Sequence, residues 1–264
     1  MRNELDLKAF LNRKVKEYNR PAFIAADPIC VPHSFDRKQD IEIAAFFAAT
    51  FAWGNRTTII GKCRELMGLM DNSPHDFVLN HKPRQLKALE GFCHRTFNTT
   101  DLLYFISFLQ HHYKKSDSLE EAFVGKALSR EDEGLSSEPI ENYLNHFYSY
   151  FFSLEDAPDR TRKHIAAPMK HSACKRLNMF LRWMVRTDKS GVDFGLWKNI
   201  HPSQLICPLD LHVARVAKRF QLIGRPHSDW QSALELTHQL RKFDPDDPAK
   251  YDFALFALGV LERF

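Results

Sequence analysis

Two residues with complementary chemistry, a lysine and an aspartate, stand at predicted helix starts in the second half of the chain. Lys175 opens a helical pattern in Ser172-Ala-Cys-Lys-Arg-Leu-Asn-Met-Phe-Leu-Arg-Trp183, and Asp210 follows Pro208 before a basic amphipathic turn. A neutral lysine amine can form a Schiff base with a substrate carbon, and a nearby carboxylate can stabilise positive charge that develops there. The pair is the constellation in this sequence that most indicates catalysis.

The surroundings of Lys175 favour the neutral amine that a nucleophile requires. Lys175 falls in the first turn of its helix, where the backbone dipole is positive and disfavours a cation by roughly 0.3–1 kcal/mol. The adjacent guanidinium of Arg176 adds charge repulsion, and partial burial would act in the same direction. The alternative is an ordinary lysine on the solvated surface, which is what most lysines are.

Asp210 occupies a position that also has a simpler explanation. An aspartate after a proline at a helix start commonly serves as the N-cap, which contributes about 1 kcal/mol to stability. The two roles are compatible, because a capping carboxylate is held rigidly, stays ionised and can still face a neighbouring cavity.

The elements that position these two residues are predicted to be helices, because apolar side chains recur at helical spacing along almost the whole chain. A first amphipathic helix is predicted from Leu5 to Tyr18, and a second begins near Asp40 and ends near Gly54, a residue type that often closes helices. Further helices are predicted over residues 56–70, 73–79, 102–113, 138–152 and 228–242, and from Asp246 or Asp247 to Leu261. Asp101 and Ser228 are the predicted caps of the helices at 102–113 and 228–242. Ser118–Glu121 has the form of a capping box.

The fold class expected from these patterns is all-α. Clusters of Val, Ile and Thr are short and lie inside helical patterns, so no strand alternation stands out. Polar stretches at 126–139 and 155–171 interrupt the helices, and the second is rich in Arg, Lys and His. We therefore expect two lobes, over 1–154 and 172–264, joined by a basic connector at 155–171.

Composition limits the class of protein further. The 264 residues carry a net charge of +4, which permits a nucleic-acid partner without demanding one. The longest early apolar run, residues 43–55, holds 13 residues, whereas a membrane span needs about 20. Five scattered cysteines without a Cys-x-x-Cys motif, and a charged N-terminus without a signal-peptide core, indicate a reduced, cytoplasmic protein. We expect a monomer without a membrane partner or a cofactor.

The segments around the lysine and the aspartate resemble the helix-hairpin-helix DNA glycosylases, the superfamily of endonuclease III and the 8-oxoguanine glycosylases. Pro208-Leu-Asp-Leu-His-Val-Ala-Arg-Val216 is similar to the family's Val-Asp-Thr/Val-His-Val-x-Arg-Val signature, whose aspartate matches Asp210. Lys175-Arg-Leu-Asn178 is similar to the family's Lys-Thr-Ala-Asn, whose catalytic lysine matches Lys175. The resemblance implies a two-lobed helical bundle of the glycosylase type, with both residues in a cleft between the lobes.

Two further segments extend the resemblance over most of the chain. Residues 41–56 are similar to the family helix that precedes a DNA-inserting loop, and residues 251–259 are similar to its last core helix. The spacing from Lys175 to Asp210 exceeds that of endonuclease III, with 188–204 as the apparent insert. The archaeal 8-oxoguanine enzymes have such a wider gap and are the nearer comparison, so we expect a bacterial branch of its own within the superfamily.

Two departures from the family pattern bear on function. The family hairpin carries Gly-x-Gly before the lysine, because glycine lets backbone N–H groups approach a phosphate. The equivalent stretch here, Met169-Lys-His-Ser-Ala-Cys174, contains no glycine. The four-cysteine iron–sulfur loop of endonuclease III is also missing, since no cysteine follows Cys207.

The function that the resemblance implies is DNA base-excision repair by a glycosylase with abasic-site lyase activity, on oxidised purines such as 8-oxoguanine. The target base would be flipped out of a damaged duplex. Asp210 would stabilise positive charge on the sugar, and Lys175 would attack its anomeric carbon. No metal site is expected.

Basic and polar side chains around these segments indicate a DNA-binding surface, although an ordinary solvated face is the alternative. Four further residues are candidates for a base pocket, with core packing as the alternative for each. The DNA-binding set is Asn55, Arg56, Arg162, Lys163, Lys170, Arg176, Arg182, Arg215 and Arg219, and the base-pocket set is Trp53, Asn178, Phe180 and Trp183.

Two other classes of function remain open from the sequence. The chain could be a non-catalytic nucleic-acid-binding helical protein that kept the fold, which the missing hairpin glycines favour. It could also be a structural or partner-binding helical protein. Proximity of the Lys175 amine and the Asp210 carboxylate at one accessible site would favour the enzyme.

Overall fold

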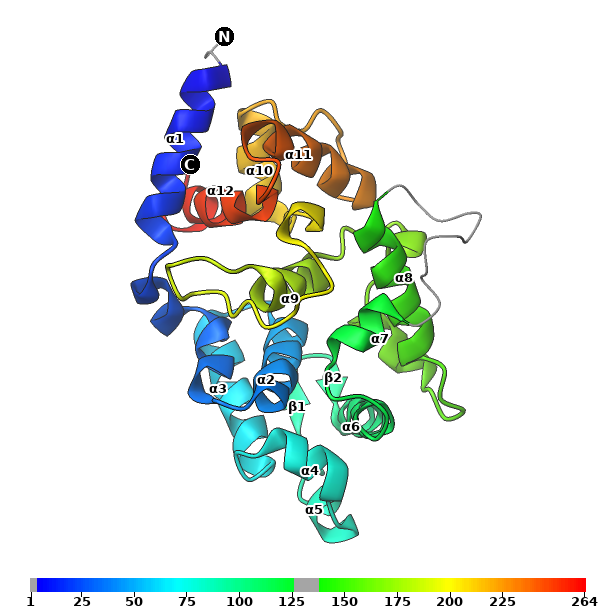
Figure 1. The fold of residues 1–264 in the computed structure, drawn as a ribbon. Coiled ribbons are helices and arrows are strands. Elements are labelled where there is room, and N and C mark those ends of the chain that lie inside the picture. The colour runs from blue at the N-terminus through cyan, green and yellow to red at the C-terminus, as the bar shows by residue number, and fades with distance from the viewer. Residues whose placement is uncertain (1–3, 126–137) are drawn as a thin grey trace. The chain divides into compact units, whose positions relative to one another are not determined.

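The computed structural model describes residues 4–125 and 138–264 (Figure 1). The regular secondary structure of these residues is almost all helical, which confirms the all-α prediction. The exception is a two-residue antiparallel pair, β1 (Cys93–His94) and β2 (Phe97–Asn98), in which Cys93 lies opposite Asn98. None of the described helices combines the length and the apolar character that a bilayer span requires.

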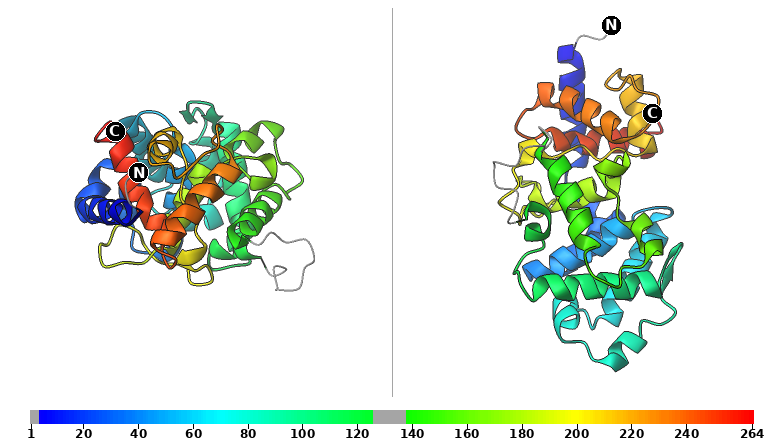
Figure 2. Two further views of the ribbon diagram at one scale, coloured as in Figure 1. Left: turned by 90° about the horizontal axis from the view of Figure 1, so that it is seen from above. Right: turned by 90° about the vertical axis from the view of Figure 1, so that its right-hand side faces the viewer.

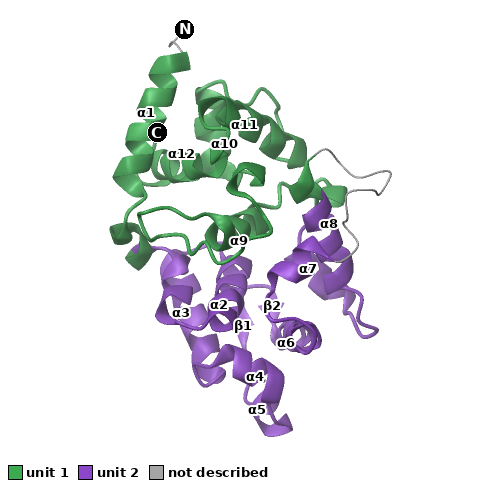
Figure 3. Cartoon of the chain, in the orientation of Figure 1, with its two compact units in different colours: residues 1–25, 138–141, 167–264 green, residues 26–137, 142–166 purple. Residues whose placement is uncertain are grey.

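The chain divides into two compact units, which Figure 3 shows in different colours. Unit 1 consists of residues 1–25, 138–141 and 167–264, and unit 2 of residues 26–137 and 142–166. The boundary after Ala166 falls inside the connector expected at 155–171. The expected lobes differ from these units in one main respect, because the N-terminal segment groups with the C-terminal part of the chain.

Unit 1 contains the segments that carry Lys175 and Asp210. Both residues begin helices where the sequence predicted helix starts. The elements are α1 (Glu4–Tyr18), the short 3-10 helices η5 (Pro168–Lys170), η6 (Pro202–Gln204) and η7 (Pro248–Lys250), and the helices α9 (Lys175–Val185), α10 (Leu211–Arg219), α11 (Trp230–Phe243) and α12 (Tyr251–Val260).

Helix α12 is the centre of unit 1, and it packs against both α1 and α10 (Figure 2). Its side chains between 251 and 259 are buried except Phe256, which is half-buried. Tyr251 Oη donates a hydrogen bond to Asn12 Oδ1 on α1 at 2.9 Å. These contacts explain why α1 belongs to unit 1 although more than 140 residues separate it from α9.

Unit 2 is built around phenylalanines, which accounts for many of the 22 in the sequence. Phe46, Phe105 and Phe151 have no exposed surface, and the rings of Phe105 and Phe151 meet edge to face at 4.8 Å. The α-helices of this unit are α2 (Lys38–Phe51), α3 (Arg56–Leu69), α4 (Pro74–Asn80), α5 (Pro83–Lys87), α6 (Thr99–Tyr113), α7 (Glu120–Val124) and most of α8 (Pro139–Phe151). The short 3-10 helices η2 (Pro28–Cys30), η3 (Pro32–Ser34) and η4 (Asp159–His164) also lie in it. A further 3-10 helix, η1 (Pro21–Ala26), lies at its boundary with unit 1.

Two predicted caps were wrong in detail, because a neighbouring side chain takes the capping position. Asn98, not Asp101, caps α6, while Asp101 lies in the first turn and accepts the Asn98 N–H at 2.9 Å. Asp229, not Ser228, caps α11 by accepting the Ser232 N–H.

The capping box expected at Ser118–Glu121 is also not formed. The N-cap of α7 is Leu119, and the Ser118 N–H donates to Ser116 Oγ at 3.2 Å. Ser118 Oγ donates to the buried carboxylate of Glu42 at 2.7 Å.

Gly259 sets how closely α12 approaches the start of α10. A methyl group at Gly259 would lie 3.0 Å from the carbonyl oxygen and 3.1 Å from Cβ of His212, which is the second residue of α10. Arg215 on the same helix donates to the Gly259 carbonyl at 2.7 Å and satisfies a carbonyl at the end of α12. The glycine therefore permits the contact that holds the first turn of α10 in place.

We predict that Gly259→Ala lowers the free energy of unfolding by about 1–3 kcal/mol, as overpacking of a tight contact does. Gly61→Ala in α3 is the matched control, because a methyl group there meets nothing within 4 Å. It should be neutral or stabilising by up to about 1 kcal/mol, from helix propensity. Urea unfolding of the two variants measures both values, and equal stability of the two would contradict this account of Gly259.

Candidate active site

The segment before Lys175 forms a tight turn without glycine. His171 and Cys174 both have left-handed backbone conformations, with φ values of 57° and 51°. Ser172 Oγ accepts the Cys174 N–H at 3.2 Å, which holds this turn, and Asn178 Nδ2 donates to the Ala173 carbonyl at 3.1 Å. The chain thus adopts at two non-glycine residues a conformation that glycine adopts more easily.

Asp210 is the N-cap of α10, as predicted. Its Oδ1 atom accepts hydrogen bonds from the backbone N–H groups of His212 and Val213, both at 2.9 Å. The preceding residues Cys207, Pro208 and Leu209 are buried. This arrangement fixes the carboxylate and leaves its second oxygen free to face another group.

The second oxygen of Asp210 faces Lys175. Lys175 Nζ lies 4.0 Å from Asp210 Oδ2, and about a quarter of each side chain is exposed, 25% and 23% respectively. The amine also lies 3.5 Å from Met179 Sδ, one turn further along α9. Two segments 35 residues apart in the sequence therefore bring an amine and a carboxylate together at a solvent-accessible place, and both residues belong to unit 1.

Directly along α9, two turns after Lys175, a buried arginine binds two carboxylates. Arg182 Nη1 donates to Asp252 Oδ2 on α12 at 2.5 Å, and Arg182 Nε lies 3.3 Å from Asp193 Oδ1. The Arg182 side chain is only 4% exposed, and its guanidinium carbon lies 4.2 Å from the ring centre of Phe253. These contacts join α9 to α12.

Arg186, one turn further along α9, extends this buried ion network. Its Nη1 atom donates to Asp193 Oδ2 at 2.5 Å, its Nη2 to Asp188 Oδ2 at 2.8 Å, and its Nε to Asp247 Oδ1 at 2.9 Å. The side chain of Arg186 is 2% exposed, and the three carboxylates raise the pKa of its guanidinium against the effect of burial. We call Arg182, Arg186 and their carboxylate partners the α9 ion network.

Asp252, which belongs to the α9 ion network, has a pKa that responds to several neighbouring charges. Burial raises the pKa of its carboxyl to about 6, while the charges of Arg182 and Lys175 lower it and the charge of Asp210 raises it. The charge of Asp252 also adds to the burial that raises the pKa of the Cys207 thiol. Asp252 therefore responds to both members of the Lys175–Asp210 pair.

Unit 1 places the predicted site residues at different depths. Phe180 and Trp183 have no exposed surface and Asn178 only 1%, which favours the core-packing alternative for these base-pocket candidates. Arg182 is buried in the α9 ion network, which corrects its assignment to a surface that contacts phosphate. Burial lowers the pKa of the half-buried Arg176 to about 10. Lys170, Arg215 and Arg219 are exposed, although Arg215 binds the end of α12.

The remaining predicted residues belong to unit 2. Asn55 is the N-cap of α3 and accepts the Thr58 N–H, which is a structural role. Trp53 is half-buried and packs edge-on against His94, with ring centres 4.9 Å apart. Lys163 is exposed, Arg56 and Arg162 are half-buried, and the Arg162 guanidinium lies 4.9 Å from the ring centre of Phe152.

Sequence reasoning missed Asp193 and Asp252, and it interpreted Asp247 only as a turn or cap residue. One signal for them was present in the sequence. Arg182 lies within the apolar run from Leu177 to Val185, and Arg186 directly follows that run. Arginines in such a run are buried, and buried arginines need carboxylate partners. No cluster of three His, Cys, Asp or Glu side chains suited to a metal ion occurs in the described parts of the chain.

The raised pKa of Asp252 predicts a pH-dependent contribution to stability. A carboxyl whose pKa rises from 3.8 to about 6 on folding contributes stability that is full below pH 3.8 and is lost as the pH rises through 6. At about 1.4 kcal/mol per pKa unit, the loss is on the order of 2–3 kcal/mol. The free energy of unfolding of the wild type, relative to Asp252→Asn, should therefore fall between about pH 4 and about pH 6 and be constant above that range. Urea unfolding measures both proteins, and a difference in unfolding free energy that is constant with pH would contradict a raised pKa for the buried Asp252 carboxyl.

Comparison with known proteins identifies the family of this chain. No curated protein and no solved structure matches it. A family model described as "Protein of unknown function (DUF2400)" matches residues 27–261, which include Lys175, Asp210 and Asp252. Because this match covers most of the sequence, the chain belongs to the DUF2400 family.

Proposed function

We propose that the protein is a DNA base-excision glycosylase with abasic-site lyase activity, in which Lys175 is the nucleophile and Asp210 the electrostatic partner. The observation that carries the proposal is the 4.0 Å approach of the Lys175 amine to the Asp210 carboxylate at an accessible place. A rigid carboxylate beside an amine at a helix start suits an attack on a sugar carbon that gains positive charge.

The proposed reaction has two stages. The lone pair of neutral Lys175 Nζ forms a bond to the anomeric carbon C1′ as the glycosidic bond breaks, and the departing base takes the bonding electrons and the proton that Nζ then loses. The bond from C1′ to the ring oxygen O4′ then breaks, O4′ takes a proton from water, and the nitrogen lone pair forms an iminium between Nζ and C1′. Loss of a proton from C2′ then expels the 3′ phosphate. Asp210 stabilises the positive charge on the sugar in the first stage.

The turn before Lys175 adopts the left-handed conformations that glycine reaches more easily. His171 and Cys174 have this conformation without glycine, and their N–H groups donate within the turn, to the Pro168 carbonyl and to Ser172 Oγ. The absence of glycine therefore does not by itself argue against the DNA-binding hairpin that the sequence resemblance implies. The substrate class favoured by the resemblance is duplex DNA with an oxidised purine or an abasic site.

We predict that borohydride traps a covalent adduct between the wild type and a duplex oligonucleotide with an abasic site. Lys175→Gln should abolish the adduct, because the amine is the attacking group. Asp210→Asn should slow trapping by about 10²–10³-fold, which is the effect of removing one electrostatic group from an active site. Gel electrophoresis of the trapped complex gives both rates.

Lys242→Gln is the control for this experiment, because Lys242 is an exposed lysine near the end of α11 in the same unit. It should trap at the wild-type rate. Wild-type trapping that is absent where a known lyase traps, or that persists in Lys175→Gln, would overturn the lyase proposal.

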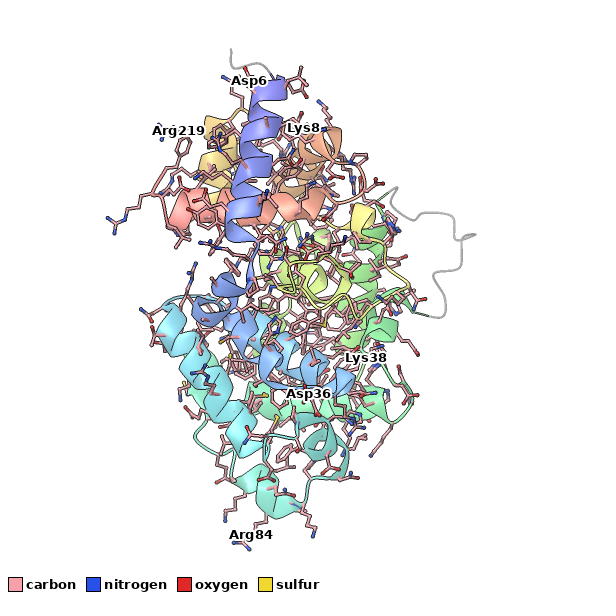
Figure 4. The ribbon with its side chains drawn as sticks, turned by 60° about the vertical axis from the view of Figure 1, so that its left-hand side comes forward. Asp6, Lys8, Asp36, Lys38, Arg84 and Arg219 are labelled. Atoms are coloured by element: carbon pink, nitrogen blue, oxygen red, sulfur yellow. The ribbon has the colours of Figure 1, made fainter. Side chains whose placement is uncertain are left out.

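A non-catalytic nucleic-acid-binding protein is the second candidate function, and the exposed basic residues of unit 1 favour it. Arg219 lies at the end of α10, where Figure 4 shows it among side chains on the surface. Lys170 is exposed close to the turn that precedes Lys175. Both candidate functions need DNA binding, but only the first needs a reactive lysine.

We predict that DNA affinity falls steeply with salt, because each phosphate contact releases counterions. Lys170→Ala and Arg219→Ala should each weaken binding to all sequences and reduce the slope of log K against log salt by about one. Arg84→Ala, an exposed arginine on α5 of unit 2 that Figure 4 labels, is the control and should leave the slope unchanged. A flat salt dependence of the wild type would contradict both candidate functions, and only a structural or partner-binding role would then remain.

A further inference from the structure

The amine of Lys175 has a second close neighbour besides Asp210, the thioether of Met179 one turn further along α9. Lys175 Nζ donates to Met179 Sδ at 3.5 Å, and it lies 4.0 Å from Asp210 Oδ2, which is beyond hydrogen-bond reach of an oxygen. The amine therefore contacts the weak acceptor directly, although an ionised carboxylate lies only slightly further away.

The thioether of Met179 is a fixed neighbour, because the side chain is almost completely buried. Met179 is 8% exposed, whereas the Lys175 side chain is 25% exposed. Side chains four residues apart on a helix lie one above the other, and helical side chains lean toward the N-terminus. Helix α9 therefore holds the sulfur atom of Met179 beside the end of the Lys175 side chain.

The carboxylate of Asp210 is equally fixed. Its Oδ1 atom accepts the backbone N–H groups of His212 and Val213, both at 2.9 Å, and these hydrogen bonds keep it at the start of α10. A direct ion pair with Lys175 would therefore have to form by movement of the flexible lysine side chain. The contact with Met179 opposes that movement, because the amine would have to leave the sulfur atom.

The two neighbours differ in their effect on the protonation of the amine. A direct hydrogen bond to a carboxylate favours the ammonium form, which is not a nucleophile. A thioether carries no charge and accepts a hydrogen bond only weakly. The sulfur atom of Met179 thus positions the Lys175 amine without favouring the ammonium as a contacting carboxylate would.

Charges from other side chains also reach the amine. Asp252 on α12 interacts with Lys175 through its charge, but its carboxylate is held by Arg182. Arg176, the next residue of α9, carries a like charge. Neither group is altered when Met179 is replaced, so a comparison between variants cancels their effects.

We propose that Met179 is a positioning residue, which holds the Lys175 amine away from a direct hydrogen-bonded ion pair with Asp210. This inference rests on the proposed role of Lys175 as an amine nucleophile. Asp210 remains close enough to stabilise positive charge on the sugar, while the lone pair of the neutral amine stays available for attack.

The test is reductive methylation with formaldehyde and cyanoborohydride in the absence of DNA, between about pH 6 and about pH 10. Peptide mass spectrometry follows each lysine, and Lys242 is the reference in every variant. Met179→Leu removes the acceptor and nearly conserves the side-chain volume. Methylation of Lys175 near neutral pH should fall about tenfold, and its pH profile should move up by about one unit, because the amine then pairs with Asp210.

Met184→Leu is the matched control, because Met184 is a fully buried methionine of the same helix. Its Lys175 should be methylated as in the wild type. A double-mutant cycle with Asp210→Asn tests the mechanism, since asparagine also caps a helix but carries no charge. In that background Met179→Leu should not slow the methylation of Lys175, because no carboxylate remains at this position to pair with the amine.

Each other outcome overturns the proposal. Unchanged methylation of Lys175 in Met179→Leu would make the thioether a bystander, and faster methylation would mean that the thioether stabilises the ammonium. A loss that persists in the Asp210→Asn background, or that Met184→Leu reproduces, would show a structural effect instead.

The assay contains no DNA, so its failure removes the role of Met179 and leaves the glycosylase proposal standing. Conversely, the expected methylation pattern without any trapped DNA adduct supports the role of Met179 while the DNA substrate is rejected.

Discussion

The α9 ion network is the constraint on which the rest of unit 1 depends. Two arginines on one face of α9 are almost without solvent contact, and each binds carboxylates from more than one segment. Loss of one partner of a buried ion pair typically costs about 3–5 kcal/mol, because the other charge remains buried. The network therefore holds α9 in one orientation against α12 and the turn that precedes it.

The position of the Lys175–Asp210 pair follows from that constraint through a short chain of contacts. Arg182 joins α9 to Asp252 on α12, and Gly259 at the other end of α12 permits the close approach of α10. Asp210 then caps α10 and faces Lys175 at the start of α9. The Arg182–Asp252 contact is buried, whereas Lys175 and Asp210 are each about a quarter exposed, so a buried ion pair supports an accessible one.

Local chemistry made the helix start at Asp210 predictable, because a proline and a capping side chain act within one turn. The start at Lys175 has no side-chain cap and followed from the helical spacing of the apolar residues after it. The proximity of the two residues followed only from the resemblance to a known superfamily, since spacing along the chain does not fix distance in space. Asp252 could not be assigned, because its properties arise from burial and from a partner 70 residues earlier in the sequence. Arg182 was misassigned for the same reason, as charge pattern alone does not report burial.

The boundaries of the two units also depend partly on local sequence and partly on contacts between distant segments. One boundary between the units falls after residue 166, inside the polar stretch at 155–171. The grouping of α1 with the C-terminal helices depends on long-range contacts, such as that between Tyr251 and Asn12, which no short pattern in the sequence encodes.

The central claim is that this ion network presents one particular amine as a nucleophile toward a sugar carbon. The most direct measurement is to digest the borohydride-reduced protein–DNA adduct and to locate the sugar remnant by tandem mass spectrometry. The account predicts that the remnant is found on Lys175 alone. Attachment to another lysine or to the N-terminal amine would contradict it.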